Sequence, residues 1–184
     1  MATQDRVPTG NGVYDEGNWT PNTGTDNYAV VDDPVGAPDD DTTYVQNIAA
    51  AAFNRITFTF AAFAITSSAI AKVTVKARCK SNNASGDEIR FYLVVSGAKA
   101  GGTAALTNSY GNYEADWLTN PATAAAWTEA EVEGTDPTNP LAEFGLRNQT
   151  IATYTMTQCY CTVTYTEATS SLPVFQSYYN NMRA

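Results

Sequence analysis

Hydrophobic and polar residues alternate along much of the chain from residue 56 onward, with the period of two that is typical of half-buried β-strands. In the first such segment, Ile56, Phe58 and Phe60 share one face and threonines occupy the other. Tyr, Phe, Thr, Val and Ile, which favour strands over helices, are frequent in these segments. The predicted strands are residues 56–60, 70–80, 88–95, 110–118, 141–147 and 153–166.

The connections contain one helix signal and one hairpin signal. Thr128 and Glu131 have the spacing of a capping box, which predicts one short helical turn over residues 128–132, or two turns if the preceding alanines join it. A turn at residues 81–86 is expected to join the strands 70–80 and 88–95 into a hairpin, although its loop is longer than the tight two-residue kind. Residues 98–105, mostly Ala and Gly, are expected to form a loop.

Six or more strands, with turns about every ten residues and one short helix, favour an all-β fold. The uneven lengths of the strands argue against a regular up-and-down barrel. We therefore expect a two-sheet antiparallel sandwich of the jelly-roll type, with extended terminal arms.

Charge divides the chain unequally. Residues 1–41 contain nine acidic residues and one basic residue, a net charge of -8 out of the chain's -9. Their many Pro and Gly residues predict an acidic extended arm, with a short strand at 27–31 as its one regular element. Residues 42–168 are the predicted β-sandwich body, and residues 169–184 form an aromatic, nearly uncharged tail.

Basic residues gather on one face of the predicted strand 70–80. Together with Arg90 on the expected partner strand, they make up half of the ten basic residues in the chain. Two interpretations stay open: an ordinary solvated sheet face, or a face for an acidic partner, such as the acidic arm of the same chain or of a neighbouring copy. The sequence pI of about 4.3 argues against nucleic acid as that partner. The residues of this predicted face are Lys72, Lys76, Arg78, Lys80 and Arg90.

Catalytic and metal-binding signals are weak. The chain has no His, the commonest general base and metal ligand, and none of the familiar nucleophile or phosphate-binding motifs. Glu114 and Asp116 share a strand face, and a glycosidase could be built from two carboxylates, but exposed acids on a strand are the more ordinary interpretation. The aspartates at 32–33 and 39–41 lack the spacing of a calcium loop. We expect no catalytic residue, no metal and no cofactor.

Five segments of the chain form a recognisable pattern: residues 39–45, 70–78, 120–128, 143–145 and 158–165. The most specific parts are Asn120-Pro121 followed by Trp127-Thr128, and the triplet from Glu143 to Gly145. Together these segments resemble a module found in small β-sandwich virion structural proteins of tailed bacteriophages. The resemblance implies a non-enzymatic structural role, as a capsid decoration protein or a tail-associated part, and it implies no catalytic residue.

The leading hypothesis is therefore a capsid decoration (cement) protein that stabilises a phage head by bridging neighbouring capsid subunits. It would assemble in the host cytoplasm, because the start of the chain lacks a secretory signal. Its expected partners are the major capsid protein and copies of itself, with a trimer as the first guess, and neither nucleic acid nor membrane. The expected interface anchors in the arm and tail are Tyr14, Trp19, Tyr28, Phe175, Tyr178 and Tyr179.

Three other functions are open. A carbohydrate-binding or host-attachment module on a phage tail or fibre would stack sugar rings on Tyr113, Trp117 and Trp127. An enzyme would use Glu114 and Asp116. A subunit of a self-assembling extracellular filament would need an export route that the N-terminus does not show.

Overall fold

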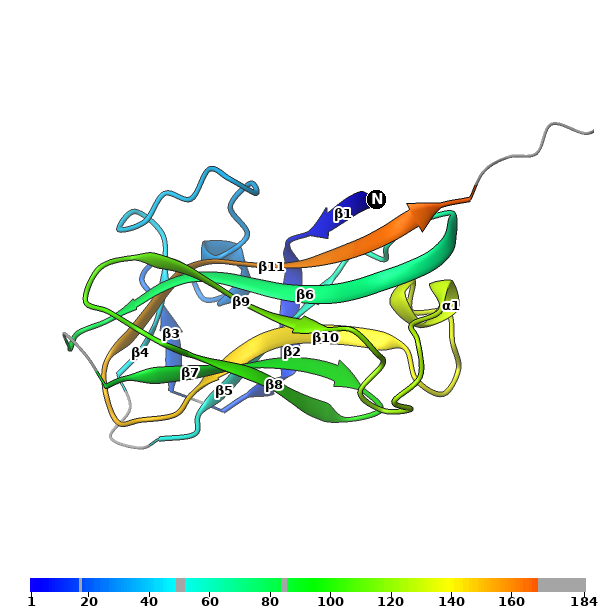
Figure 1. Ribbon diagram of the computed structural model, residues 1–184. Coiled ribbons are helices and arrows are strands. Elements are labelled where there is room, and N and C mark those ends of the chain that lie inside the picture. The colour runs from blue at the N-terminus through cyan, green and yellow to red at the C-terminus, as the bar shows by residue number, and fades with distance from the viewer. Residues whose placement is uncertain (17, 49–51, 84–85, 169–184) are drawn as a thin grey trace, which may run out of the picture.

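The protein is a sandwich of two antiparallel sheets in the computed structural model, which describes residues 1–16, 18–48, 52–83 and 86–168 (Figure 1). Sheet A has the order β3-β4-β11-β6-β9, with β1 also paired to β11, and sheet B has the order β2-β5-β10-β7-β8. The strands are β1 (Ala2–Arg6), β2 (Pro8–Asp15), β3 (Trp19–Pro21), β4 (Val45–Asn47), β5 (Arg55–Phe60), β6 (Ser67–Ser81), β7 (Glu88–Val95), β8 (Ala98–Ala105), β9 (Gly111–Trp117), β10 (Leu141–Asn148) and β11 (Tyr154–Glu167).

The eight strands from β4 to β11 have the connectivity of a jelly roll. The chain crosses between the sheets after β4, β5 and β6, makes one hairpin from β7 to β8, and crosses again after β8, β9 and β10. This places β4-β11-β6-β9 opposite β5-β10-β7-β8, the arrangement of two interlocked Greek keys. The predicted fold class, an all-β antiparallel sandwich of the jelly-roll type, is confirmed.

The apolar residues of the alternating strands form the core between the two sheets. On β6, Val73, Val75, Ala77 and Cys79 are at most 2% exposed, and they face the apolar side chains of sheet B. Burying a large apolar side chain stabilises the fold by about 1.5–3 kcal/mol. The cysteines at 79, 159 and 161 are free and belong to this core, and burial raises the pKa of each thiol. They act as small apolar residues.

The prediction of a separate N-terminal arm is wrong. Strand β1 pairs with β11 along its whole length, and β2 pairs with β5, so residues before 41 extend both sheets. The expected strand at 27–31 is instead a 3₁₀ helix, η1 (Tyr28–Val30). Gly10 and Gly12 are among the residues on which the prediction of an irregular arm rests, but they lie within β2, where an added Cβ would come within 2.6 Å of side-chain oxygens. Glycine is needed here because side chains of β5 and β10 come close to the backbone of β2, and not because the chain turns.

Two further predictions about local pairing are wrong. Strands β6 and β7 do not form a hairpin, because β6 pairs with β11 and β9 while β7 pairs with β10 and β8. Residues 98–105 form strand β8, not a loop. Its Gly101 lies against the ring of Trp117, where a Cβ would be only 2.2 Å from the nearest ring carbon. Small residues there make room for a core tryptophan.

The predicted helical turn is confirmed as α1 (Glu129–Val132), opened by a capping box between Thr128 and Glu131. Buried Asn120 donates to the Glu131 side chain at 2.7 Å, and the Trp127 indole donates to the Trp117 carbonyl at 3.0 Å. This part of the phage-like resemblance therefore has a structural role. Within the described residues, no helix is long and apolar enough to cross a membrane.

The triplet from Glu143 to Gly145 also has a structural role. The buried Glu143 carboxylate accepts hydrogen bonds from the Val13 backbone at 3.0 Å and from the Thr57 hydroxyl at 2.6 Å, which fastens β2 to sheet B. Phe144 is fully buried. A Cβ on Gly145 would lie 2.0 Å from the carbonyl oxygen of Ile56, so only glycine fits beside β5.

Candidate functional site

The outer face of sheet A carries most of the polar side chains of three adjacent strands. On β6 these are the residues that alternate with the core valines, and they are directly opposite polar residues of β9 and β11. Lys76, for example, has Glu114 on one side and Tyr160 on the other. The strand register therefore builds a continuous polar surface.

Each cation of β6 on this face has an acidic partner within the same chain. Asp40 binds Arg78 through both carboxylate oxygens, and the other pairs are single contacts. The four pairs are Lys72–Asp116 (2.8 Å), Lys76–Glu114 (3.7 Å), Arg78–Asp40 (2.8 Å between Nη2 and Oδ2) and Lys80–Asp41 (2.7 Å). The basic row is therefore neutralised internally, and two of the acids come from the N-terminal part of the chain.

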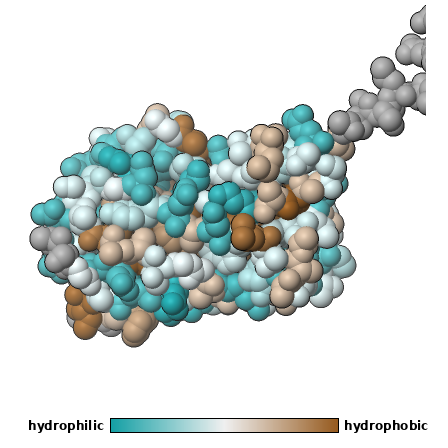
Figure 2. Space-filling model, viewed as in Figure 1, coloured by the Kyte–Doolittle hydropathy of each residue, from teal (hydrophilic) through white to brown (hydrophobic). Residues whose placement is uncertain are grey.

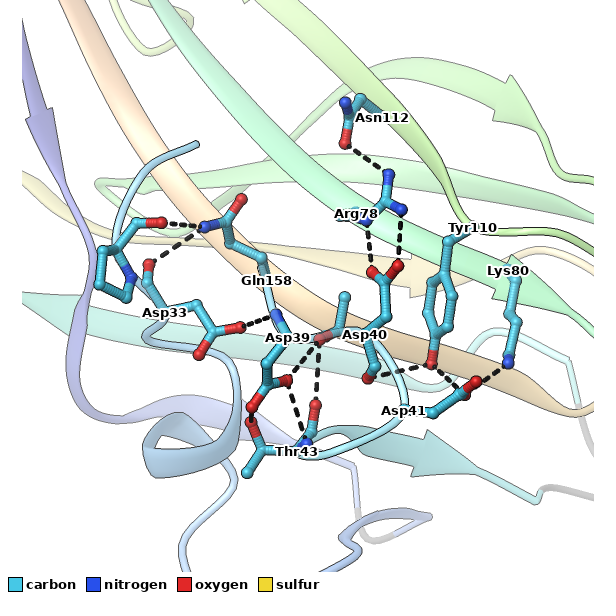
Figure 3. Close-up of polar contacts among 12 residues, drawn as sticks. Asp33, Asp39, Asp40, Asp41, Thr43, Arg78, Lys80, Tyr110, Asn112 and Gln158 are labelled. Carbon is cyan, nitrogen blue, oxygen red and sulfur yellow. Dashed lines mark hydrogen bonds and ion pairs between the residues drawn. The ribbon is translucent and has the colours of Figure 1, made fainter. Parts of the chain in front are cut away.

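Residues 32–43, which we call the acidic strap, cross the outer face of sheet A (Figure 3). The Gln158 amide donates to the carbonyl oxygens of Asp33 and Pro34 at 3.1 and 2.8 Å. Asp39 accepts from the backbone and hydroxyl of Thr43 at 3.1 and 2.8 Å, which closes the turn. Side-chain contacts at both ends therefore hold the strap against β11 and β6.

These contacts and the neighbouring charges shift the pKa values of the strap's aspartates. The hydrogen bond from Arg78, aided by the charges of Arg78 and Lys80, outweighs burial and lowers the pKa of the Asp40 carboxyl. Burial, with the nearby negative charges of Asp39 and Asp32, raises the pKa of Asp33. The Tyr110 ring lies 4.1 Å from the Lys80 ammonium, and its hydroxyl reaches Asp41 at 3.2 Å. Arg78 thus keeps Asp40 ionised. Next to this pair, the Lys80 ammonium stacks on the Tyr110 ring.

A cleft of about 330 Å³ lies between the strap and the sheet. Gly36 and Pro38 form its strap side. The Tyr160 ring, 5.7 Å from the Lys76 ammonium, is the aromatic surface on the sheet side. Burial raises the pKa of the Tyr160 hydroxyl, which therefore stays neutral and able to donate. The polar lining residues are Lys76, Arg78, Asn112, Glu114 and Gln158.

The chemistry of this face favours binding over acid–base catalysis. Glu114 and Asp116, the glycosidase candidates, pair with Lys76 and Lys72. Burial would raise the pKa of Asp116, but hydrogen bonds from Lys72 and Thr74 and the charges of both lysines outweigh it and lower that pKa. A general acid for glycoside hydrolysis needs the opposite shift. Among the described residues, no group of three or more His, Cys, Asp or Glu could hold a metal ion.

The predicted interface anchors of the arm lie within the fold. Trp19 is 3% exposed and donates its indole N–H to the Asn54 carbonyl at 3.2 Å. Tyr14 stacks on Arg55 at 4.4 Å, and Tyr28 packs against the core. These rings fasten residues 1–41 to their own sandwich. The predicted tail anchors, Phe175, Tyr178 and Tyr179, lie outside the described residues.

Two other predicted sites are placed differently from expectation. Trp117 and Trp127 are buried in the core, so neither presents an open ring for sugar stacking. Tyr113 is half-buried against the core and is one of the residues that line the cleft. Arg90 lies on β7 in sheet B, apart from Lys72 and the other cations of β6. Tyr160, the ring in the cleft, was missed because it alternates with core cysteines in a strand of many threonines.

No family model matches the chain, and no curated protein matches it. Among solved structures, a xylanase 10B fragment from Clostridium thermocellum, containing CBM22-1 and GH10 modules with bound xylohexaose, is 7% identical with a TM-score of 0.47. That match covers 91% of this chain and 30% of the longer one. A family 29 carbohydrate-binding module from Piromyces equi is 7% identical (TM-score 0.43, covering 96% and 99%). The C-terminal CBM6 of LamC from Zobellia galactanivorans is 11% identical (TM-score 0.43, covering 89% and 99%).

Proposed function

We propose that this protein is a non-catalytic carbohydrate-binding module, and that it binds a neutral glycan in the cleft between the acidic strap and sheet A. The observation that carries the proposal is the cleft itself: a polar groove lined by the tyrosines Tyr113 and Tyr160, in which the charges are already paired.

The lining matches the chemistry of a sugar. Sugar hydroxyls both donate and accept hydrogen bonds, and the amides of Asn112 and Gln158 do the same. The apolar face of a sugar ring packs on an aromatic side chain, which Tyr160 provides. Because Lys76 and Arg78 are neutralised by Glu114 and Asp40, an uncharged ligand meets no excess of either charge.

The cleft is also preorganised. Arg78 is fixed by Asp40 and by the Asn112 side chain at 3.4 Å, and Gln158 is fixed by two carbonyl groups of the strap. Polar groups held before binding lose little conformational entropy when the ligand arrives. The ion pairs of the strap therefore support the binding surface.

A glycan array followed by calorimetry with the strongest neutral ligand tests the proposal, and xylohexaose is a reasonable first oligosaccharide. The Tyr160→Ala variant should bind the glycan about tenfold more weakly, which is the loss of affinity expected when a stacked ring is removed. Tyr14→Ala makes the same chemical change on sheet B and should leave the affinity unchanged. An array without any neutral glycan hit, or equal losses in both variants, would refute the proposal.

A second proposal, attachment to a virion as a decoration or tail-associated protein, is favoured by one observation. Ile48, Phe53 and Ile151 are 67%, 58% and 65% exposed, and they lie at the same end of the sandwich. Figure 2 shows hydrophobic atoms gathered at the lower left, at this end. Co-sedimentation with phage heads tests this role, and a double Ile48→Ser, Ile151→Ser variant that sediments as well as wild type would contradict it.

A further inference from the structure

The outer face of sheet B carries a row of three arginines. Arg147 on β10 is the Cα partner of Arg55 on β5 and of Arg90 on β7, so the three side chains lie next to one another on adjacent strands. Neighbouring strands are about 4.8 Å apart, and like charges directly opposite one another destabilise a sheet. A row of this kind needs a compensating interaction.

The fold provides only part of that compensation. Arg55 has one carboxylate, Glu16, at 3.6 Å, and Arg147 donates to the neutral Gln149 side chain at 3.0 and 2.8 Å. Among the described residues, neither Arg90 nor Arg147 has a carboxylate within ion-pair distance. The Nε atoms of Arg55 and Arg90 are buried without a hydrogen-bond partner there. Three guanidinium groups thus share one acid.

Aromatic rings hold two of these guanidinium groups in place. Arg55 lies between the rings of Tyr14 and Tyr92, at 4.4 and 4.9 Å. Arg147 lies between Tyr92 and Phe53, at 5.4 and 4.9 Å. Stacking covers the faces of a guanidinium group and does not use its N–H edges, whose geometry matches planar oxyanions. On Arg147 the edge formed by Nε and Nη2 already donates to Gln149, so its remaining N–H groups would serve a ligand. The aromatic rings therefore orient the guanidinium groups of Arg55 and Arg147 without neutralising their charge.

We propose that the arginine row, Arg55, Arg147 and Arg90, is a second binding site that takes the oxyanion group of an acidic glycan, a carboxylate or a sulfate. Charge-assisted bonds from the guanidinium edges would hold the oxyanion. The 58% exposed ring of Phe53 would contact the sugar beside it. The net charge of -9 disfavours dense polyanions such as nucleic acid, whereas an isolated acidic group meets mainly the local arginines.

This site lies on the opposite sheet from the cleft and does not depend on the neutral glycan proposed there. Its test is calorimetry of the full chain with oligogalacturonate, with sulfated carrageenan oligosaccharide and with neutral xylohexaose. Arg90→Gln should weaken binding of the acidic ligand about tenfold, the loss expected for one charge-assisted contact. Lys99→Gln removes the same charge from β8 of the same sheet and should change the affinity less than twofold, an effect of screened charge alone.

Arg90→Lys keeps the charge but loses the planar fork, and it should give an intermediate affinity; thermal unfolding checks that each variant is folded. Binding of oligogalacturonate supports a carboxylate ligand, and binding of the carrageenan alone supports a sulfate ligand. The proposal is overturned if neither acidic ligand binds more tightly to wild type than to Arg90→Gln, or if Lys99→Gln loses as much affinity. Loss of xylohexaose binding in Tyr160→Ala reports on the cleft separately.

Discussion

The outer faces of the two sheets differ in how their positively charged side chains are paired. On sheet A, each cation of β6 is paired with a carboxylate, and the acidic strap supplies two of these. On sheet B, three arginines stand side by side, and aromatic rings stack on two of them, Arg55 and Arg147. The first face is preorganised and nearly neutral, and the second is preorganised and still cationic. Whether a basic residue is free to bind an acidic ligand therefore depends on the residues that surround it in the fold, and cannot be judged from its place in the sequence alone.

The largest expected effect comes from removing the support of the sheet B face. Glu143→Leu leaves the Val13 N–H and the Thr57 hydroxyl without their buried acceptor, and it should lower the free energy of unfolding by about 3 kcal/mol. Urea denaturation measures this loss. Glu167→Leu, an exposed site at the end of β11, should change stability by less than about 0.5 kcal/mol. Equal effects would show that Glu143 does not fasten β2.

A smaller effect should separate the two ion pairs of the strap. Arg78→Gln removes the two-point contact with Asp40, which is partly shielded from solvent, and should cost about 1–2 kcal/mol of stability. Lys80→Gln breaks the pair with Asp41, whose side chain is 75% exposed, so little should change. Thermal or urea unfolding of both variants compares them. A larger loss in Lys80→Gln would contradict the assignment of Arg78 as the main anchor.

The smallest expected effect is a pH dependence of that anchor. The pKa of Asp40 is lowered in the folded chain, chiefly by the hydrogen bond from Arg78. Its stabilisation is therefore fully present above the unfolded value of about 4, and it is lost as pH falls through the lower folded value. The stability difference between wild type and Arg78→Gln should shrink below about pH 4. Thermal unfolding along an acid series measures it, and a constant difference would rule out this linkage.

The strands that alternate in hydrophobicity could be predicted from the sequence, and so could the capping box of α1. Both depend on residues close together in the chain: the alternation of β6, for example, directly separates Val75 from Lys76. The glycine-containing strands could not be predicted. In β2 and β8 glycine is required because another side chain or strand approaches closely, a cause that lies far away in sequence.

The candidate site was only partly visible in the sequence. The basic row of β6 and the acidic residues at 39–41 could be recognised from the sequence, which also leaves open an acidic segment of the same chain as the partner of that row. That Arg90 belongs to another sheet could not be seen, because β6 and β7 look like a hairpin. The arginine row comes from three strands, and its order depends on the pairing of β5, β10 and β7.

The position of β11 has a consequence for how the molecule is made. This strand is bordered by β6 on one side and by β1 and β4 on the other, so it joins the earliest strands to the middle of the chain. A ribosome would release β1, β4 and β6 long before the strand that unites them. Such distant pairings are slow to form. Until β11 emerges, the nascent chain holds open strand edges, which are prone to pair with other chains.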